Sequence, residues 1–219
     1  MPLTVPTFSA EQVRAAEAPL LAAGVPLMRR AAHALAEVIG EYEPKNILVL
    51  AGAGDNGGDA LFAAAELASR GVQVDVLRTS TRIHEEALAA AIDAGARVVP
   101  LDELDPAAYN LVVDGILGIG ARGGLRGTAR EAVEALLPHG PRVIAVDLPS
   151  GLDPDTGEAN SAVLHADTTV TFGGVKVGLT RADGPRLAGR IELVRLGLEL
   201  ADPVGEAVVD RIRVAHDQP

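Results

Sequence analysis

Short, unbroken apolar segments alternate with helical segments along most of this chain, and this alternation restricts the possible folds more than any other feature. Apolar runs of this kind are typical of parallel strands that are buried on both faces. They lie at 46–50, 72–77, 97–101, 111–117, 143–148, 168–172 and 191–196, with helical periodicity at 59–70, 83–94 and 128–137. The pattern predicts an α/β fold with a mostly parallel, twisted sheet, right-handed crossovers and helices on both faces.

Two helices are expected before the first strand of the chain. Ser9 and Gln12 have the spacing of a capping box, Gly24 is placed as a helix stop, and Pro26 suits the first turn of a second helix. The acidic segment from Glu199 onward is expected to be loosely held. Because no repeat or long linker divides the sequence, we expect a single domain over residues 1–219.

Charge and cysteine content exclude several classes of function. The net charge is −11, and no run of Lys or Arg lies beside aromatic residues, so a nucleic-acid partner is not expected. The absence of cysteine excludes disulfides and thiolate chemistry and fits a reducing compartment. Residues 1–8 lack the features of a signal peptide, and nowhere do about 18 apolar residues follow one another. We therefore expect a cytoplasmic protein with no membrane association.

The loop after the first apolar run contains the G-x-G-x-x-G spacing of a dinucleotide fingerprint at residues 52–57. That spacing is weak evidence alone, and carboxylates at Asp55 and Asp59 would oppose a diphosphate. Ligand hydroxyls, or a cation held by Asn56 with acids from neighbouring loops, suit this loop better. A simpler alternative is a capped turn in which Asp59 is the N-cap of the following helix.

A second loop, from Asp114 to Gly127, has five glycines in the ten residues that begin at Gly118. So many glycines let the backbone approach a ligand closely, and backbone amides can form an anion-binding concavity. Arg122 or Arg126 could add charge-assisted hydrogen bonds, so we place a diphosphate here. The alternative is a flexible surface loop.

Asp147 begins the third loop, Asp-Leu-Pro-Ser-Gly-Leu-Asp, and is the best candidate for acid-base chemistry. Asp114 and Asp147 end consecutive predicted strands, so they should project into one crevice and repel each other unless a cation intervenes. Asn56 and Ser150 would supply neutral oxygens for that cation. No Ser-His-Asp arrangement is evident, and the histidines lack zinc-ligand spacing.

In this order, the loops resemble those of the YjeF N-terminal domain family. Its motifs N-N-G-G-D-G, D-A-x-F-G-T-G, V-D-x-P-S-G-x-D and T-F-G-x-x-K-x-G-L correspond to residues 55–60, 114–120, 147–153 and 171–179. The resemblance covers roughly residues 9–198. This sequence departs from the family pattern at Asp55, Ala60, Ile119 and the segment 28–32, where Met-Arg-Arg-Ala-Ala stands in place of Met-Glu-Asn-Ala-Gly.

The resemblance implies a Rossmann-like, three-layer α-β-α sandwich and an epimerase that interconverts the R and S forms of NADHX and NADPHX, the 6-hydroxy hydrates of NADH and NADPH. It implies a potassium ion bound by Asn56, Asp114 and Ser150, with Asp147 as the acid-base residue. It also implies a homodimer and an ADP- or ATP-dependent NAD(P)HX dehydratase, fused or separate, as functional partner. The residues that it implies for dinucleotide binding are Asp55, Asn56, Gly57, Gly58, Asp59, Gly118, Ile119, Gly120, Ala121, Arg122, Gly123, Gly124 and Asp147.

Two other functions stay open on the sequence. Some domains of this family act as non-catalytic scaffolds that bind a dinucleotide or a partner, although the presence of Asp147 opposes that role here. An ordinary NAD-dependent dehydrogenase is the other alternative, because Asp75 follows Gly57 at about the distance expected for a carboxylate that holds a ribose hydroxyl.

Overall fold

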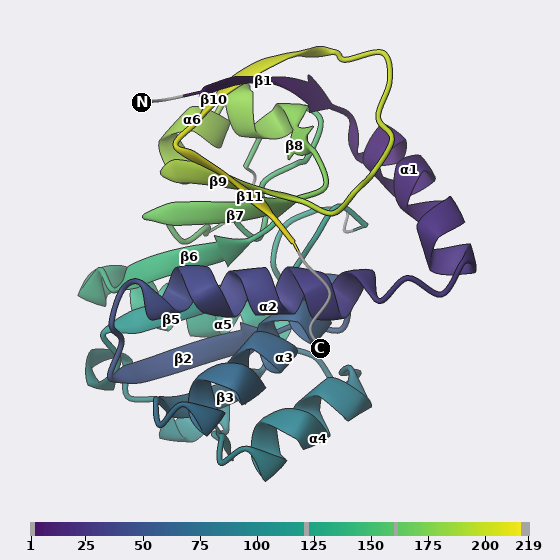
Figure 1. The fold of residues 1–219 in the computed structure, drawn as a ribbon. Helices are drawn as coiled ribbons and strands as arrows, with labels where there is room; N and C mark the ends of the chain where they lie inside the picture. Colours follow the sequence, from purple (N-terminus) through teal and green to yellow (C-terminus); the bar gives the residue numbers. More distant parts are fainter. Residues whose placement is uncertain (1–2, 121–122, 160–161, 216–219) are drawn as a thin grey trace.

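A computed structural model describes residues 3–120, 123–159 and 162–215 (Figure 1). Its main feature is an eight-stranded sheet in the order β11-β9-β7-β6-β5-β2-β3-β4, in which every neighbouring pair is parallel. The strands are β2 (Asn46–Ala51), β3 (Gln73–Arg78), β4 (Arg97–Val98), β5 (Leu111–Gly115), β6 (Arg142–Val146), β7 (Thr168–Phe172), β9 (Arg190–Arg195) and β11 (Arg211–Val214). The predicted α/β fold with a mostly parallel sheet is confirmed.

Helices cover both faces of this sheet, as predicted. The helices are α1 (Ala10–Ala22), α2 (Leu27–Gly40), α3 (Asp55–Ser69), α4 (Glu85–Asp93), α5 (Gly127–Leu136) and the short α6 (Gly184–Leu187). One apolar core lies between the sheet and α2, α3 and α4, and a second lies between the opposite face and α5. Both cores are almost entirely aliphatic, so the helices approach the sheet closely and the three layers form a compact sandwich.

A small second sheet joins the two ends of the described chain. It has the order β10-β1-β8, where β1 is Leu3–Phe8, β8 is Val175–Lys176 and β10 is Gly205–Val209. Two expectations are therefore wrong: a strand precedes the helices α1 and α2, and the segment after Glu199 supplies strands to both sheets. Each of these edge segments buries only part of its side chains, so neither has the continuous apolar run that marks a central strand.

The predicted capping box is confirmed, but the helix that begins at the first glycine loop starts earlier than expected. Ser9 Oγ accepts a hydrogen bond from the Gln12 amide at 3.2 Å, and the Ser9 amide donates to Gln12 Oε1 at 2.8 Å. Gly54 is the N-cap of α3, so Asp59 lies inside this helix and its reading as an N-cap is wrong. Pro26 is likewise the N-cap of α2 rather than part of its first turn.

The glycines of α3 are needed for packing. A Cβ on Gly57 would lie 2.1 Å from the Gly52 carbonyl oxygen, and one on Gly58 would lie 2.8 Å from Met28 Sδ. A side chain at either position would clash, so this packing requires glycine despite its poor helix propensity. A sequence rule that treats glycine as a helix breaker therefore places the start of this helix too late.

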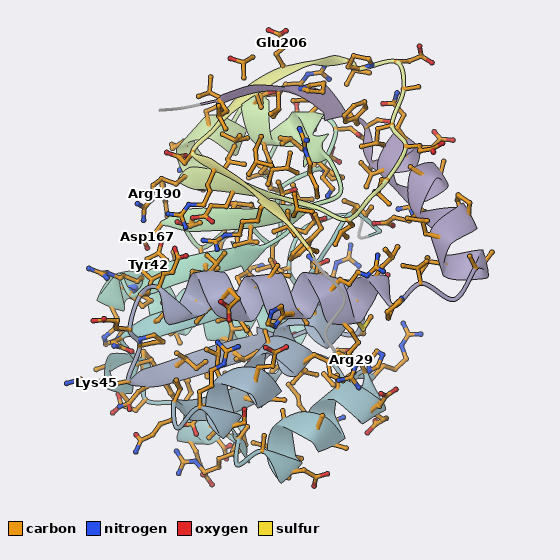
Figure 2. The ribbon with its side chains drawn as sticks, viewed as in Figure 1. Arg29, Tyr42, Lys45, Asp167, Arg190 and Glu206 are labelled. Atoms are coloured by element: carbon orange, nitrogen blue, oxygen red, sulfur yellow. The ribbon has the colours of Figure 1, made fainter. Side chains whose placement is uncertain are left out.

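The amino ends of the strands are held by contacts that lie far from the loops of interest. Tyr42 follows α2 and its hydroxyl bonds Thr168 Oγ1 at 2.5 Å, while Arg190 Nη2 donates to the same hydroxyl at 2.8 Å. Figure 2 shows Tyr42 and Arg190 on the same side of the molecule, with Arg29 on the opposite side. Across residues 3–120, 123–159 and 162–215, no helix has the length and apolar character needed to span a membrane.

Candidate active site

The predicted site residues come together at the carboxyl ends of β2, β5 and β6. Asn56 lies in the first turn of α3 just after β2, Asp114 is near the end of β5, and Asp147 follows β6 directly. Ser150 lies three residues beyond Asp147, and its amide donates to Asp114 Oδ2 at 2.8 Å. Because parallel strands end at one edge of the sheet, these loops form a single crevice, as the sequence predicts.

Asp147 is held in an unusual conformation by a buried network. Its φ of 67° lies in the left-handed region, and its carboxylate Oδ1 accepts hydrogen bonds from Thr171 Oγ1 at 3.1 Å and the Phe172 amide at 3.2 Å. Lys176 Nζ donates to the same oxygen and also to the Phe172 carbonyl at 2.8 Å. All three bonds to the carboxylate use Oδ1, so the position and orientation of Asp147 are set by the fold.

Lys176 is the main residue of the site to which the sequence assigned no role. Its side chain is 1% exposed and that of Asp147 is 7% exposed, so the pair is an ion pair within the protein interior. A charged pair at this depth persists when each partner is satisfied by further hydrogen bonds, which Thr171 and the Phe172 backbone provide. The signal in the sequence was a lysine between two valines, Val175 and Val177, because a lysine in an apolar segment needs a buried anion.

A second acid, Asp59, lies close to the pair but has no basic side chain bound to it in the described ranges. It lies inside α3 and is 6% exposed, and within the described ranges its Oδ1 has no hydrogen-bond partner. Burial raises the pKa of Asp59 well above its ordinary value, and the negative charges of Asp147, Asp55 and Glu17 raise it further. The raised pKa favours the protonated form of Asp59, which can donate a hydrogen bond.

Glu17 joins the same group of acids from a distant helix. It lies on α1 and is half-buried, and burial raises its pKa, while Lys176 opposes this effect and Asp147 and Asp55 add to it. The sequence has no local signal for this placement, because α1 reaches the crevice only through the tertiary fold. Its neighbour Arg14 donates to the Ile119 carbonyl at 3.0 Å and so connects α1 to the glycine-rich loop after β5.

Asn56, Asp114 and Ser150 form a cluster of oxygen-bearing groups around Leu117. Asn56 Nδ2 donates to the carbonyls of Leu117 and Val146, at 3.0 and 2.5 Å, and Ser150 Oγ accepts from the Leu117 amide at 2.9 Å. A Cβ on Gly118 would lie 2.4 Å from Asn56 Oδ1, so this position requires glycine. The cluster joins three loops through main-chain groups that only the folded chain brings together.

The donor set suits a monovalent cation. Asp114 is 1% exposed, burial raises its pKa, and no basic side chain is recorded beside it in the described ranges. One carboxylate with an amide, a hydroxyl and nearby carbonyls provides hard oxygen ligands of low total charge, which fit the expected potassium ion.

A cleft opens beside this cluster along the glycine-rich loop. Its lining includes Gly118 and Gly123 from the loop after β5, and Pro149, Gly151 and Asp153 from the loop after β6. Ile119, Gly120 and Gly124 belong to the same loop, whereas Ala121 and Arg122, two of the predicted binding residues, lie outside the described residues. The cleft therefore lies where the sequence predicts the diphosphate.

Residues 28–32, where the sequence departs from the family pattern, pack against α3. Arg29 stacks over the Phe62 ring, with its guanidinium carbon 3.6 Å from the ring centroid, and its Nη2 bonds Glu86 Oε1 at 2.7 Å. Met28 packs over Gly58. The two residues therefore connect the start of α2 to α3 and α4, and Arg29 is already engaged by an acid and a ring.

The sheet order and the site at the strand ends define the class: this is a Rossmann-like α/β protein. The YjeF-related protein N-terminus family matches residues 24–178. The chain is 56% identical to an NAD(P)H-hydrate epimerase of Microbacterium testaceum over 95% of this chain and 87% of the relative. The chain belongs to the YjeF N-terminal family.

Two further comparisons extend this result. The bifunctional NAD(P)H-hydrate repair enzyme Nnr of Mycobacterium tuberculosis (strain ATCC 25618 / H37Rv) is 44% identical, over 89% of this chain but only 42% of that longer protein. The crystal structure of the yeast protein ynu0 superposes with a TM-score of 0.71 at 22% identity, covering 80% of this chain and 84% of that one. The yeast structure supports the fold alone.

Proposed function

We propose that this chain is an NAD(P)H-hydrate epimerase, an isomerase that interconverts the R and S 6-hydroxy hydrates of NADH and NADPH in nicotinamide nucleotide repair. Relatives of that name are 52–56% identical over about 90% of the chain. The observation that carries the residue assignments is the buried Asp147–Lys176 pair at the carboxyl end of β6. A buried ion pair is costly, and one that lies among acids at the carboxyl ends of the strands is more typical of a catalytic site than of a scaffold.

Asp147 is the acid-base residue of the proposed reaction. Rebuilding the stereocentre at C6 requires either loss and return of the C6 hydroxyl or opening and closure of the N1–C6 bond, and both routes move a proton at the hydroxyl oxygen. Because Lys176, Thr171 and the Phe172 amide all bind Oδ1, we assign Oδ2 to the substrate. Lys176 is a positioning residue that keeps the carboxylate in place.

Asp59 complements this carboxylate. Its pKa is raised and its Oδ1 is unpartnered in the described ranges, so the protonated acid is suited to donate a hydrogen bond to a hydroxyl or carbonyl of the substrate. The two acids thus have different roles: Asp147 accepts a proton from the substrate, and Asp59 donates a hydrogen bond to it. Such a separation of two carboxyl groups by their surroundings is a recurrent feature of acid-base sites.

Asn56, Asp114 and Ser150 would hold the potassium ion. When bound, the ion would compensate the charge of the buried Asp114 carboxylate and so keep the loops after β2, β5 and β6 in register. The residues that would contact the dinucleotide come from two loops: Asp55 to Gly58 after β2, and Gly118 to Gly120, Ala121, Arg122, Gly123 and Gly124 after β5. Their backbone amides and the absence of side chains at the glycines suit close approach of a diphosphate.

The assay starts from diastereomerically pure R-NADHX in potassium buffer and follows S-NADHX by chromatography. Formation of S-NADHX well above the spontaneous rate is the expected result, and the same assay in sodium buffer is expected to be slower. A rate equal to the spontaneous rate would instead favour a binding module, which calorimetric titration with NAD⁺ or NADP⁺ would then detect.

The proposal also includes partners. We expect the S hydrate to pass to an ADP- or ATP-dependent dehydratase, fused to this domain or separate, since relatives include proteins named as bifunctional repair enzymes. Homodimer formation is a further expectation, for which light scattering coupled to size exclusion is the test. Reconversion of R-NADHX to NADH should require both activities, and a chain that supported it without a dehydratase would contradict this order.

A further inference from the structure

The strand order has a switch point of the kind across which dinucleotides bind in doubly wound sheets. From β4 to β7 the order is β4-β3-β2-β5-β6-β7, the arrangement of the doubly wound nucleotide-binding sheet, with its switch point between β2 and β5. Asp147 and Lys176 lie on the β6 side of this point. The carboxyl end of β3 is three strand spacings away from β6, about 14 Å. A dinucleotide in an extended conformation reaches across this span with its adenosine half.

The glycine loop between β2 and α3 has the geometry of a nucleotide-binding turn. A Cβ on Gly52 would lie 1.8 Å from the Ile116 carbonyl oxygen, and one on Gly57 would lie 2.1 Å from that of Gly52, so these glycines allow close packing. A Cβ on Gly54 would meet nothing within 4 Å. The first and third glycines thus serve the fold, while the middle one leaves open space beside the loop where a ligand can approach.

In such sheets, the residue at the end of the second strand contacts the adenosine ribose: an acid binds the 2′-hydroxyl of NAD, and an arginine accommodates the 2′-phosphate of NADP. Asp75, the acid that the sequence offered for this role, is unsuitable. It lies three residues before the end of β3 and is bound by Arg97 Nε and Nη2 at 3.0 and 2.7 Å and by the Tyr109 hydroxyl at 2.8 Å. The reading of Asp75 as a ribose ligand is therefore wrong.

The residue that does end β3 is Arg78, and the loop that follows is Thr-Ser-Thr-Arg, closing with Arg82. Both arginines are exposed, and within the described ranges neither pairs with a carboxylate; the nearby Glu86 binds Arg29 instead. Arg78 Nη2 donates to the Thr81 carbonyl at 3.1 Å, and Ser80 Oγ accepts from the Arg82 amide at 3.3 Å. In a chain of net charge −11, two such arginines around a serine hydroxyl suit a phosphate.

This loop is held against the strand end and the helix that flank the nucleotide crevice. The Thr79 amide and hydroxyl both donate to the Ala51 carbonyl at the end of β2, at 2.9 and 3.0 Å. Two residues beyond the loop, His84 Cδ2 lies 3.2 Å from the position that a Cβ on Gly58 would occupy. The arginines are therefore carried on a backbone that is fixed relative to the Gly52–Gly57 turn.

We infer that Arg78 and Arg82, with the Ser80 hydroxyl, form a subsite for the 2′-phosphate of the adenosine ribose, so that the chain binds the phosphorylated dinucleotide in preference to the unphosphorylated one. This inference rests on the proposed function for the identity of the ligand as a dinucleotide. The 2′-phosphate is a dianion, and two arginines that can each donate two hydrogen bonds give it charge and geometry together.

The test is calorimetric titration of the full chain with NADP⁺ and NAD⁺, for the wild type, R78Q, R82Q and the double variant. Each substitution is expected to weaken NADP⁺ binding about tenfold and to leave NAD⁺ binding unchanged. Arg142→Gln is the matched control, because Arg142 is exposed at the amino end of β6, on the opposite edge of the sheet. Equal affinities for NADP⁺ and NAD⁺ in the wild type, or no detectable NADP⁺ binding at millimolar concentration, would overturn the inference.

Turnover separates this inference from the proposed function. With R-NADPHX and R-NADHX as substrates, the ratio of their kcat/KM values is expected to fall in R78Q and R82Q through KM, with kcat unchanged. If both hydrates are epimerised equally well and the substitutions alter neither, the subsite is wrong and the epimerase stands. If neither hydrate reacts but NADP⁺ still binds more tightly than NAD⁺, the subsite stands and the epimerase is wrong.

Discussion

Two aspartates of the same sheet region, Asp75 within β3 and Asp147 directly after β6, are each paired with a basic residue, and the two pairs differ in exposure and surroundings. Asp147 meets Lys176 where the side chains are 7% and 1% exposed. Asp75 meets Arg97 where they are 16% and 74% exposed. Water and counterions screen the second pair but not the first, so the same kind of contact has different energetics in the two places.

The pairs also differ in what surrounds them. Hydrogen bonds from Arg97 and Tyr109 lower the pKa of Asp75, outweighing the opposite effect of its partial burial, so this acid is charged and satisfied. Around Asp147 lie Asp59, Asp55 and Glu17, and the pKa values of Asp59 and Glu17 are raised. A satisfied acid at a sheet edge stabilises the fold. Acids that repel one another within a crevice are typical of sites of acid-base chemistry.

Exchanging either aspartate for asparagine tests this contrast most strongly. Asp147→Asn is expected to lower kcat for epimerisation of R-NADHX by about 10²–10⁴-fold, because the amide cannot exchange a proton. Asp75→Asn should retain the wild-type rate, measured by the same chromatographic assay. Circular dichroism on both variants verifies that they fold. An active Asp147→Asn variant would remove the catalytic assignment.

Removing the basic partner compares the two environments by stability. Lys176→Met leaves the Asp147 carboxylate buried without its cation and is expected to reduce the free energy of unfolding by about 3–5 kcal/mol. Arg97→Met should cause little change, because the Arg97 side chain is 74% exposed. Urea unfolding followed by circular dichroism measures both. Similar losses in the two variants would show that burial does not separate the pairs.

The dependence of stability on pH should have opposite signs in the two regions. Below the ordinary carboxyl pKa of 3.8, Asp59 is protonated in both the folded and the unfolded chain. Above 3.8 the unfolded chain releases this proton and the folded chain keeps it, so folding loses about 1.4 kcal/mol per pH unit until the pH passes the raised pKa of the folded state. Asp59→Asn should remove this loss and flatten the profile above pH 4.

Asp75 provides the comparison at acid pH. Its pKa is lowered in the folded state, so its contribution is present above 3.8 and is lost as the pH falls through the folded value. Asp75→Asn should therefore reduce acid sensitivity and leave the profile above pH 5 as in the wild type. Urea titrations at a series of pH values give both results, and a wild-type slope that Asp59→Asn did not alter would contradict the raised pKa of this acid.

The hydroxyl partners give the smallest expected effects. Thr171 donates to Asp147 within the interior, and Tyr109 donates to Asp75 at a partly exposed site. Thr171→Val is expected to cost about 1–3 kcal/mol of unfolding free energy, and Tyr109→Phe about 1 kcal/mol or less. Thermal unfolding resolves such a difference, and a reversed order would mean that exposure does not govern these hydrogen bonds.

The parallel sheet and the candidate site loops could be predicted because their signals are local. Continuous apolar runs mark strands that are buried on both faces, and the loops that follow them carry Asn56, Asp114, Asp147 and Ser150 in the order that the family shares. The strand β1 and the strands after Glu199 were missed because half-exposed edge strands have short, mixed patterns. The start of α3 was misplaced because Gly57 and Gly58 pack against Gly52 and Met28, and such contacts form only in the folded chain.

The sequence by itself determined the fold class, the crevice at the strand ends and the residue types that the chemistry needs. Only the tertiary structure decided which acids are paired and which have raised pKa values. Lys176 reaches Asp147 from β8, Asp59 adds its carboxyl from α3, and Glu17 approaches from α1, so the groups that set one another's protonation come from distant segments. Protonation depends on burial and on the distance between charges, and neither quantity exists until the chain has folded.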